Sequence, residues 1–158
     1  MSWVAGIDFS THAIDVVLID ENDVEPPQWH RYPLEGQDAF ARARDVRRAL
    51  KRGPLPPFVQ DLLAVGIEDP RGQNAGALYR IQGGILASLS PNVLVQPWVP
   101  SQWRKAVGLP GNASKQHIAE WVIAENGSTA YASWPQDACD AYCIALATRQ
   151  ALTRKEAA

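Results

Sequence analysis

Four acidic side chains stand where apolar residues are expected. Asp8 lies inside one apolar run and Glu68 ends another, while Asp137 and Asp140 begin an alanine-rich segment three residues apart. A carboxylate in apolar surroundings is costly unless a partner neutralises it. Four carboxylates brought together repel one another, so divalent cations are their natural partners. The pattern favours two-metal phosphoryl transfer, and a nuclease in particular.

The type of ligand narrows the choice of metal. Hard carboxylate oxygens suit Mg²⁺, with Mn²⁺ as a substitute, better than Zn²⁺. Two ions about 3.5–4 Å apart can clamp a scissile phosphate, and Asp8 is the best candidate to bridge them. We expect two ions per site once substrate is bound. Taken singly, Asp137 and Asp140 also suit the positive end of a helix, and Glu68 could be an ordinary strand end.

The elements that must position these acids follow from periodicity and from helix and turn signals. We predict strands over 3–9, 13–20, 28–34, 62–68 and 92–96, and helices over 37–51, from a capping Asn74 to about Leu89, from a capping Ser114 to about Glu125, and from Pro135 to about Leu152, with 53–57 ending the first helix and 100–113 forming a loop. This order predicts one α/β domain over residues 1–158 with a mixed sheet. If the first and fourth strands are neighbours, Asp8 and Glu68 stand side by side.

Composition sets further bounds. The chain has 158 residues, 46% of them hydrophobic, and no apolar run near the roughly 18 residues that cross a membrane. Its N-terminal segment is unlike a secretory signal, so we expect a cytoplasmic protein. Cys139 and Cys143 lack further ligands at zinc-site spacing and are expected to be core thiols.

Basic residues gather in two groups, although the net charge is −2. The first group runs from Arg42 to Arg52, and a solvated helix face explains it at least as well as DNA binding does. The second group contains Arg104, Lys105 and Lys115, and Trp103 beside it could stack on a base.

In order and spacing, these motifs resemble those of the RuvC-like Holliday-junction resolvases, within the RNase H-like nucleases. The matching segments are Gly6-Ile7-Asp8-Phe9-Ser10, Val65-Gly66-Ile67-Glu68 and Asp137-Ala138-Cys139-Asp140-Ala141. The resemblance covers nearly the whole chain. It implies an RNase H-like five-stranded mixed sheet flanked by helices. The short chain would suit a phage-encoded version.

The same resemblance implies a homodimeric, Mg²⁺-dependent endonuclease that nicks four-way DNA junctions symmetrically. It assigns metal binding to Asp8, Glu68, Asp137 and Asp140, and places Lys115 at a DNA phosphate or the transition state. It assigns Arg104 and Lys105 to the DNA backbone, and the helix 74–89 to the dimer interface. The loop after Glu68 lacks the family's aromatic, and Arg71 could stack there instead. Flaps and forks are therefore also possible substrates.

Other classes remain open at this stage. An RNase H acting on RNA–DNA hybrids would use similar acids. Gly6 to Thr11 also looks like the phosphate loop of sugar kinases and actin-like ATPases, but these need two such lobes and a second glycine-rich motif. A non-catalytic DNA-binding scaffold is a third alternative, and the presence of all four acids argues against it.

Overall fold

A mixed sheet forms the centre of the computed structural model, which describes residues 2–52, 61–73 and 75–156. The strands lie in the order β3-β2-β1-β4-β5. The antiparallel half contains β1 (Trp3–Phe9), β2 (Ala13–Asp20) and β3 (Gln28–Pro33), and the parallel half adds β4 (Leu62–Glu68) and β5 (Leu94–Trp98) to β1. The predicted hairpin and the predicted neighbouring of the first and fourth strands are both confirmed.

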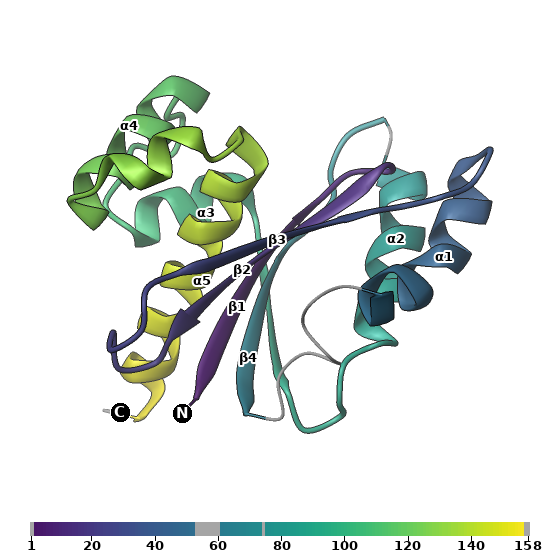
Figure 1. Ribbon diagram of the computed structural model, residues 1–158, viewed down its shortest axis with the longest axis horizontal. Helices are drawn as coiled ribbons and strands as arrows, with labels where there is room; N and C mark the ends of the chain where they lie inside the picture. The colour runs from purple at the N-terminus through teal and green to yellow at the C-terminus, as the bar shows by residue number, and fades with distance from the viewer. Residues whose placement is uncertain (1, 53–60, 74, 157–158) are drawn as a thin grey trace.

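Helices cover both faces of this sheet (Figure 1). One face carries α1 (Ala39–Arg52) and α2 (Ala75–Leu86), which pack on each other. The other carries α3 (Pro100–Ala106), α4 (Lys115–Asn126), the short 3₁₀ helix η1 (Thr129–Ser133) and α5 (Gln136–Glu156). The α5 helix lies along β1, β2 and β4, at the middle of the sheet. The predicted α/β class with a five-stranded mixed sheet is confirmed.

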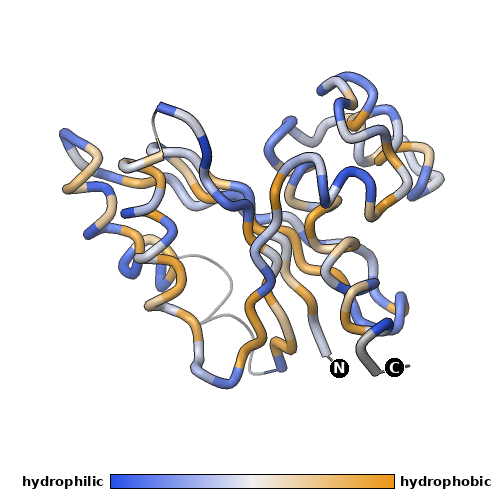
Figure 2. The backbone as a smooth tube through the Cα atoms, turned by 180° about the vertical axis from the view of Figure 1, so that it is seen from behind, coloured by the Kyte–Doolittle hydropathy of each residue, from blue (hydrophilic) through white to orange (hydrophobic). Residues whose placement is uncertain are grey.

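Two apolar cores follow from the alternation of side chains along the strands. Ile7 and Ile67 point to the α1/α2 side and pack with Val46, Ile81 and Ile85. The other side holds a second core, formed by Val4, Val17, Ile19, Ala64, Trp103, Val122, Cys143, Ile144 and their neighbours. Apolar residues accordingly recur along the strands and the helices beside them (Figure 2). The two cysteines are free and buried, as predicted.

Glycines let α5 approach the sheet closely. A Cβ atom at Gly6 would lie 1.9 Å from the backbone oxygen of Ala141, and one at Gly66 would lie 2.0 Å from the hydroxyl of Thr148. Only a residue without a side chain fits at such a separation. The close approach holds the start of α5, with its acids, against the ends of β1 and β4.

Several element boundaries differ from the predictions, among them the end of α5, which continues to Glu156. Residues 100–106 form α3 rather than loop, because Pro100 suits a first helical turn, Gln102 accepts the Val99 backbone N–H at 3.3 Å, and Trp103 anchors the helix in the core. The last strand begins at Leu94 and includes Pro97, which an edge strand tolerates. The second helix ends at Leu86.

The two other predicted helix signals have different outcomes. Ser114 caps α4, since its hydroxyl accepts the His117 backbone N–H at 3.1 Å. The capping role of Asn74 and the stop at 53–57 lie outside the described residues. None of the helices in residues 2–52, 61–73 and 75–156 combines the length and the apolar composition needed to cross a bilayer.

Candidate active site

A row of polar residues crosses the α5 side of the sheet. Asp8 on β1 is opposite Asp15 on β2, and Asp15 is opposite Arg31 on β3. Ile7 pairs with Ile67 of the parallel strand β4, so Glu68 follows on the same side as Asp8. Paired positions in a sheet point to the same face. The strands therefore gather three carboxylates and a guanidinium beneath α5.

The start of α5 adds Asp137 and Asp140, which share one helical face. The charges of both residues act on Asp8 in the sheet. Burial raises the pKa of Asp8 well above its usual range, and the carboxylates of Glu68, Asp140, Asp137 and Asp15 raise it further, in that order. The structure thus brings together all four acids singled out from the sequence.

Each of these acids has one oxygen held by a donor. The Phe9 backbone N–H donates to Asp8 Oδ1 at 3.0 Å, the Trp103 indole donates to Glu68 Oε2 at 3.1 Å, the Gln136 amide donates to Asp140 Oδ1 at 2.8 Å, and Arg31 donates to Asp137 Oδ2 at 3.2 Å. These bonds orient the carboxylates and leave the other oxygen of each for a further partner.

The cluster favours protonation in the absence of cations. Burial raises the pKa of Asp140 to about 6, against the hydrogen bond from Gln136, and the charge of Glu68 adds to the rise. Burial also raises the pKa of Glu68, although the Trp103 indole and the charge of Arg104 oppose it. A site that penalises several negative charges at once is suited to bind positive charge.

The four carboxylates are suitable ligands for Mg²⁺ or Mn²⁺, since each offers a hard oxygen. Within the described residues, no three His, Cys, Asp or Glu side chains already converge as closely as ion ligands do. The four carboxylates would hold ions together once their side chains lie closer to one another than they do in this structure.

Comparison with solved structures defines the fold. The chain aligns with Thermus thermophilus RuvC at a TM-score of 0.64 and 23% identity, over 97% of this chain and 96% of that one. It aligns with T. thermophilus RuvC in complex with Holliday junction substrate at a TM-score of 0.67 and 22% identity, over 98% and 96%. The protein has the RuvC fold. No family model and no curated protein matches the sequence.

One DNA-binding assignment is wrong on this RuvC fold. Trp103 has no exposed surface, so it is not placed to stack on a base, and its indole serves Glu68 instead. Its neighbour Arg104 is partly buried, lies 5.0 Å from the Trp103 ring centre, and donates to the Gly111 carbonyl at 3.2 Å. The charge of Arg104 acts on Glu68 and Asp140, so this arginine belongs to the candidate site.

The remaining basic candidates are at the surface. Lys105 and Lys115 are exposed on α3 and α4, on the same side of the sheet as the acids. Arg71 is exposed after β4 and forms an ion pair with Asp69 at 3.5 Å. All three are accessible to a large anionic ligand.

Sequence reasoning missed Asp15 and Arg31. Asp15 is fully buried, accepts the Trp29 indole N–H at 2.9 Å, and lies 3.6 Å from the Arg31 guanidinium. Burial raises the pKa of Asp15, against the effects of Trp29 and Arg31. Asp15 could have been found by pairing the predicted hairpin in register, which places it opposite Asp8, and Arg31 by adding the third strand, which places it opposite Asp15.

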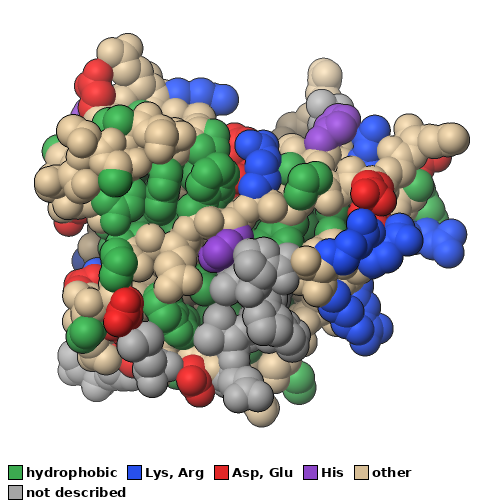
Figure 3. Space-filling model, in the orientation of Figure 1, with side chains coloured by type: hydrophobic (Ala, Val, Ile, Leu, Met, Phe, Trp, Pro, Cys, Tyr) green, Lys and Arg blue, Asp and Glu red, His purple; other side chains and the backbone are tan. Residues whose placement is uncertain are grey.

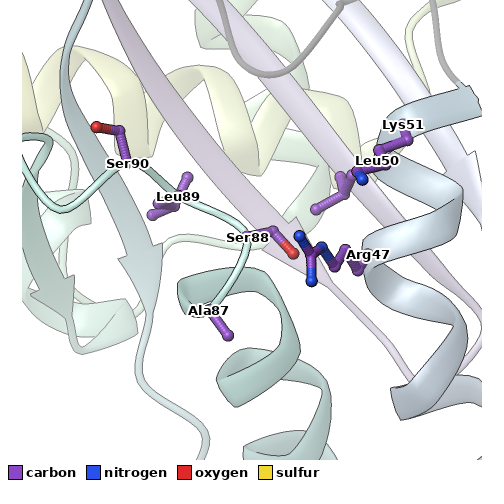
Figure 4. Close-up of a pocket in the computed structure, with 7 residues that line it drawn as sticks. All are labelled: Arg47, Leu50, Lys51, Ala87, Ser88, Leu89 and Ser90. Atoms are coloured by element: carbon purple, nitrogen blue, oxygen red, sulfur yellow. The ribbon is translucent and has the colours of Figure 1, made fainter.

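The opposite side of the sheet has a different character. A pocket of about 390 Å³ lies between α1 and the segment after α2, and Figure 4 shows Arg47 reaching toward Ser88 there. Basic side chains gather over α1 (Figure 3). Arg48 and Arg52 are partly neutralised by the buried Asp45. The sheet separates these basic side chains from the acids. Their position favours the interpretation that they form a solvated helix face.

Proposed function

We propose that the protein is a metal-dependent endonuclease that resolves Holliday junctions and other branched DNA by paired nicks. One observation carries the proposal. Asp8, Glu68, Asp137 and Asp140 lie together on a RuvC fold, and the charge of each of the other three raises the pKa of Asp8. Clustered carboxylates of this kind serve phosphodiester hydrolysis in two-metal sites.

The four carboxylates would share the work of holding the ions. Asp8, whose carboxylate is influenced by the other three, would be the shared ligand, and Glu68, Asp137 and Asp140 would complete the set that holds the ions. Bound Mg²⁺ or Mn²⁺ would supply a water of lowered pKa and would stabilise the leaving oxygen. Trp103 and Gln136 would keep Glu68 and Asp140 aimed at the site, and Arg104 would add positive charge beside the scissile phosphate.

Branched DNA is the proposed substrate because the fold is that of a protein solved with a Holliday junction. Lys115, Lys105 and Arg71 are exposed, and we propose that they contact DNA phosphates. Lys115 is also proposed to help stabilise the transition state. We propose that it acts on this DNA in the cytoplasm.

A homodimer through 74–89 would give paired nicks. On α2, Tyr79 and Leu86 are exposed apolar residues seven positions apart, and no residue of the described part of the chain fills the space where a side chain of Gly83 would be. Residues at this spacing share a helical face. Such a face is suited to pack on its copy, which would place two active sites on one junction.

The test is cleavage of an immobile four-way junction in Mg²⁺ and in Mn²⁺, beside duplex, flap and RNA–DNA hybrid substrates. We expect symmetrical nicks in the junction, and a loss of more than about 100-fold in Asp8→Asn, because even partners that only orient a metal ligand are worth about 10–100-fold. Cleavage of hybrid alone would indicate an RNase H. Junction binding without cleavage in either metal would indicate a scaffold.

A further inference from the structure

Asp137 differs from the other three acids in the kind of donor that holds it. Asp8, Glu68 and Asp140 accept from neutral groups, whereas Asp137 Oδ2 accepts from the Arg31 guanidinium at 3.2 Å. Within the described residues, it is the one of the four acids with an ion pair. A guanidinium bound to this carboxylate competes with a metal ion for its negative charge.

Arg31 also has a second carboxylate within reach. Its guanidinium lies 3.6 Å from Asp15 Oδ2, and the Asp15 side chain is only 2% exposed. Arg31 and Asp137 are each 42% exposed, so water reaches their side of the arrangement. Ion pairs open to solvent are weak and easily exchanged. A buried carboxylate, by contrast, loses much if its counter-charge is taken away.

We propose that Arg31 is a positioning residue that pairs with both Asp137 and Asp15 in the metal-free protein and keeps only Asp15 when a metal ion binds Asp137. The proposal rests on the proposed function. Arg31 lies on β3 and Asp137 lies on α5. The Arg31 side chain can therefore move away from Asp137 while the β3 backbone stays in the sheet. Asp15 is the partner that keeps it, since the guanidinium already lies 3.6 Å from Asp15 and the two residues are opposite each other on β2 and β3.

This arrangement has a consequence for metal binding. An ion that binds Asp137 must displace the Arg31 cation or bind against its repulsion, so the free protein binds metal less tightly than its carboxylates alone would. Substitution of Arg31 by glutamine removes the competing charge. We expect Mn²⁺ to bind Arg31→Gln about two- to fivefold more tightly, the range expected from an exposed ion pair.

The experiment measures Mn²⁺ binding to the DNA-free protein by electron paramagnetic resonance and by calorimetry. Arg149→Gln is the matched control, because Arg149 also pairs with an acid, Asp23, but away from the site. Asp15→Asn combined with Arg31→Gln guards against misfolding, since it removes the buried charge that Arg31 neutralises. In an Asp137→Asn background, the effect of Arg31→Gln should fall below about 1.5-fold, because coupled residues are not additive.

Each outcome decides the matter. Tighter binding in the Arg31 variants that disappears without Asp137 supports the proposal. Equal or weaker binding in the folded Arg31 variants overturns it and leaves the metal site intact. If the wild-type protein and Asp8→Asn bind Mn²⁺ equally, the metal site of the proposed function fails, and this inference fails with it.

Discussion

The indole of Trp103 donates to the Glu68 carboxylate at 3.1 Å, and this bond joins the short helix α3 to the end of β4. Trp103 is completely buried, while Glu68 is only partly so. The tryptophan is therefore an internal support for a candidate metal ligand. Its position also explains why residues 100–106 are helical, since the ring fixes α3 on the core.

Trp103→Phe tests this support. Phenylalanine keeps most of the packing but cannot donate to Glu68, and a hydrogen bond to a charged group contributes about 1.5–3 kcal/mol. We expect the free energy of unfolding, measured with urea, to fall by about that amount. We also expect junction cleavage to fall about 10–100-fold, as for other groups that orient a metal ligand.

The control for Trp103 is Trp98→Phe. The Trp98 indole donates to the neutral Thr148 hydroxyl at 2.9 Å. Its loss should cost about 1 kcal/mol of stability and little cleavage activity. Equal loss of activity in the two variants would mean that Trp103 acts through general stability alone.

The stability of the metal-free protein should depend on the ionisation of Asp140. Its pKa rises from 3.8 to about 6 on folding, so the folded state binds the proton more tightly than the unfolded chain. This contribution to stability is complete below about pH 4 and is lost as pH rises through about 6. We expect the Tm of the wild type, relative to Asp140→Asn, to fall by a few degrees between pH 5 and 8.

Comparison with Asp140→Asn removes the contributions of other groups. Asp20 and Asp45, for example, have lowered pKa values because hydrogen bonds outweigh burial, so their stabilisation disappears toward low pH. Addition of Mg²⁺ should restore the wild-type Tm above pH 6 and leave the variant less affected. A difference that does not change with pH would contradict the placement of Asp140 among the other acids.

Gly6→Ala should be strongly destabilising. The added methyl group would meet the α5 backbone, with 1.9 Å to the Ala141 oxygen and 2.4 Å to the Ala145 nitrogen. Backbone cannot rotate away as a side chain can, so we expect a loss of about 3 kcal/mol or more in urea unfolding. Any folded fraction should have displaced acids and little cleavage activity.

Gly83→Ala is the matched control for Gly6→Ala. Among the residues that the structure describes, none outside the adjoining helix backbone comes within 4 Å of a Cβ atom at this helical position. Alanine should therefore stabilise the monomer fold by about 0.5–1 kcal/mol. If both substitutions destabilise alike, the close contact of β1 with α5 is not the cause. Sedimentation equilibrium of the same variant, beside Leu86→Glu, tests the proposed dimer face.

Lys105 and Lys115 should contribute to DNA affinity through phosphate contacts. Each contact releases counterions, so its loss should lower the slope of log K against log salt by about 0.9. We expect this change in Lys105→Ala and Lys115→Ala, measured by fluorescence anisotropy with a junction. Lys51→Ala is the control, since Lys51 lies on α1, across the sheet. An equal change in slope for Lys51 would place the DNA on both faces.

Much of the fold was accessible from local sequence. Alternating and continuous apolar runs indicated all five strands, and the helical periodicity and the Ser114 cap indicated α1 and α4. The candidate acids were also accessible, because a carboxylate in an apolar run is unusual wherever the run lies. These signals depend only on neighbours in the chain, so they do not require the fold to be known.

The contacts that make the candidate site were decided by tertiary structure. Arg31 and Asp137 are 106 residues apart, and Glu68 and Trp103 are 35 apart. No local preference encodes such pairs; they arise because sheet register aligns β1, β2 and β3, and because Gly6 lets α5 rest on the strands. Trp103 shows the difference. Its basic neighbours in the sequence predicted contact with DNA, whereas the packing of α3 buries the side chain and directs its indole to Glu68.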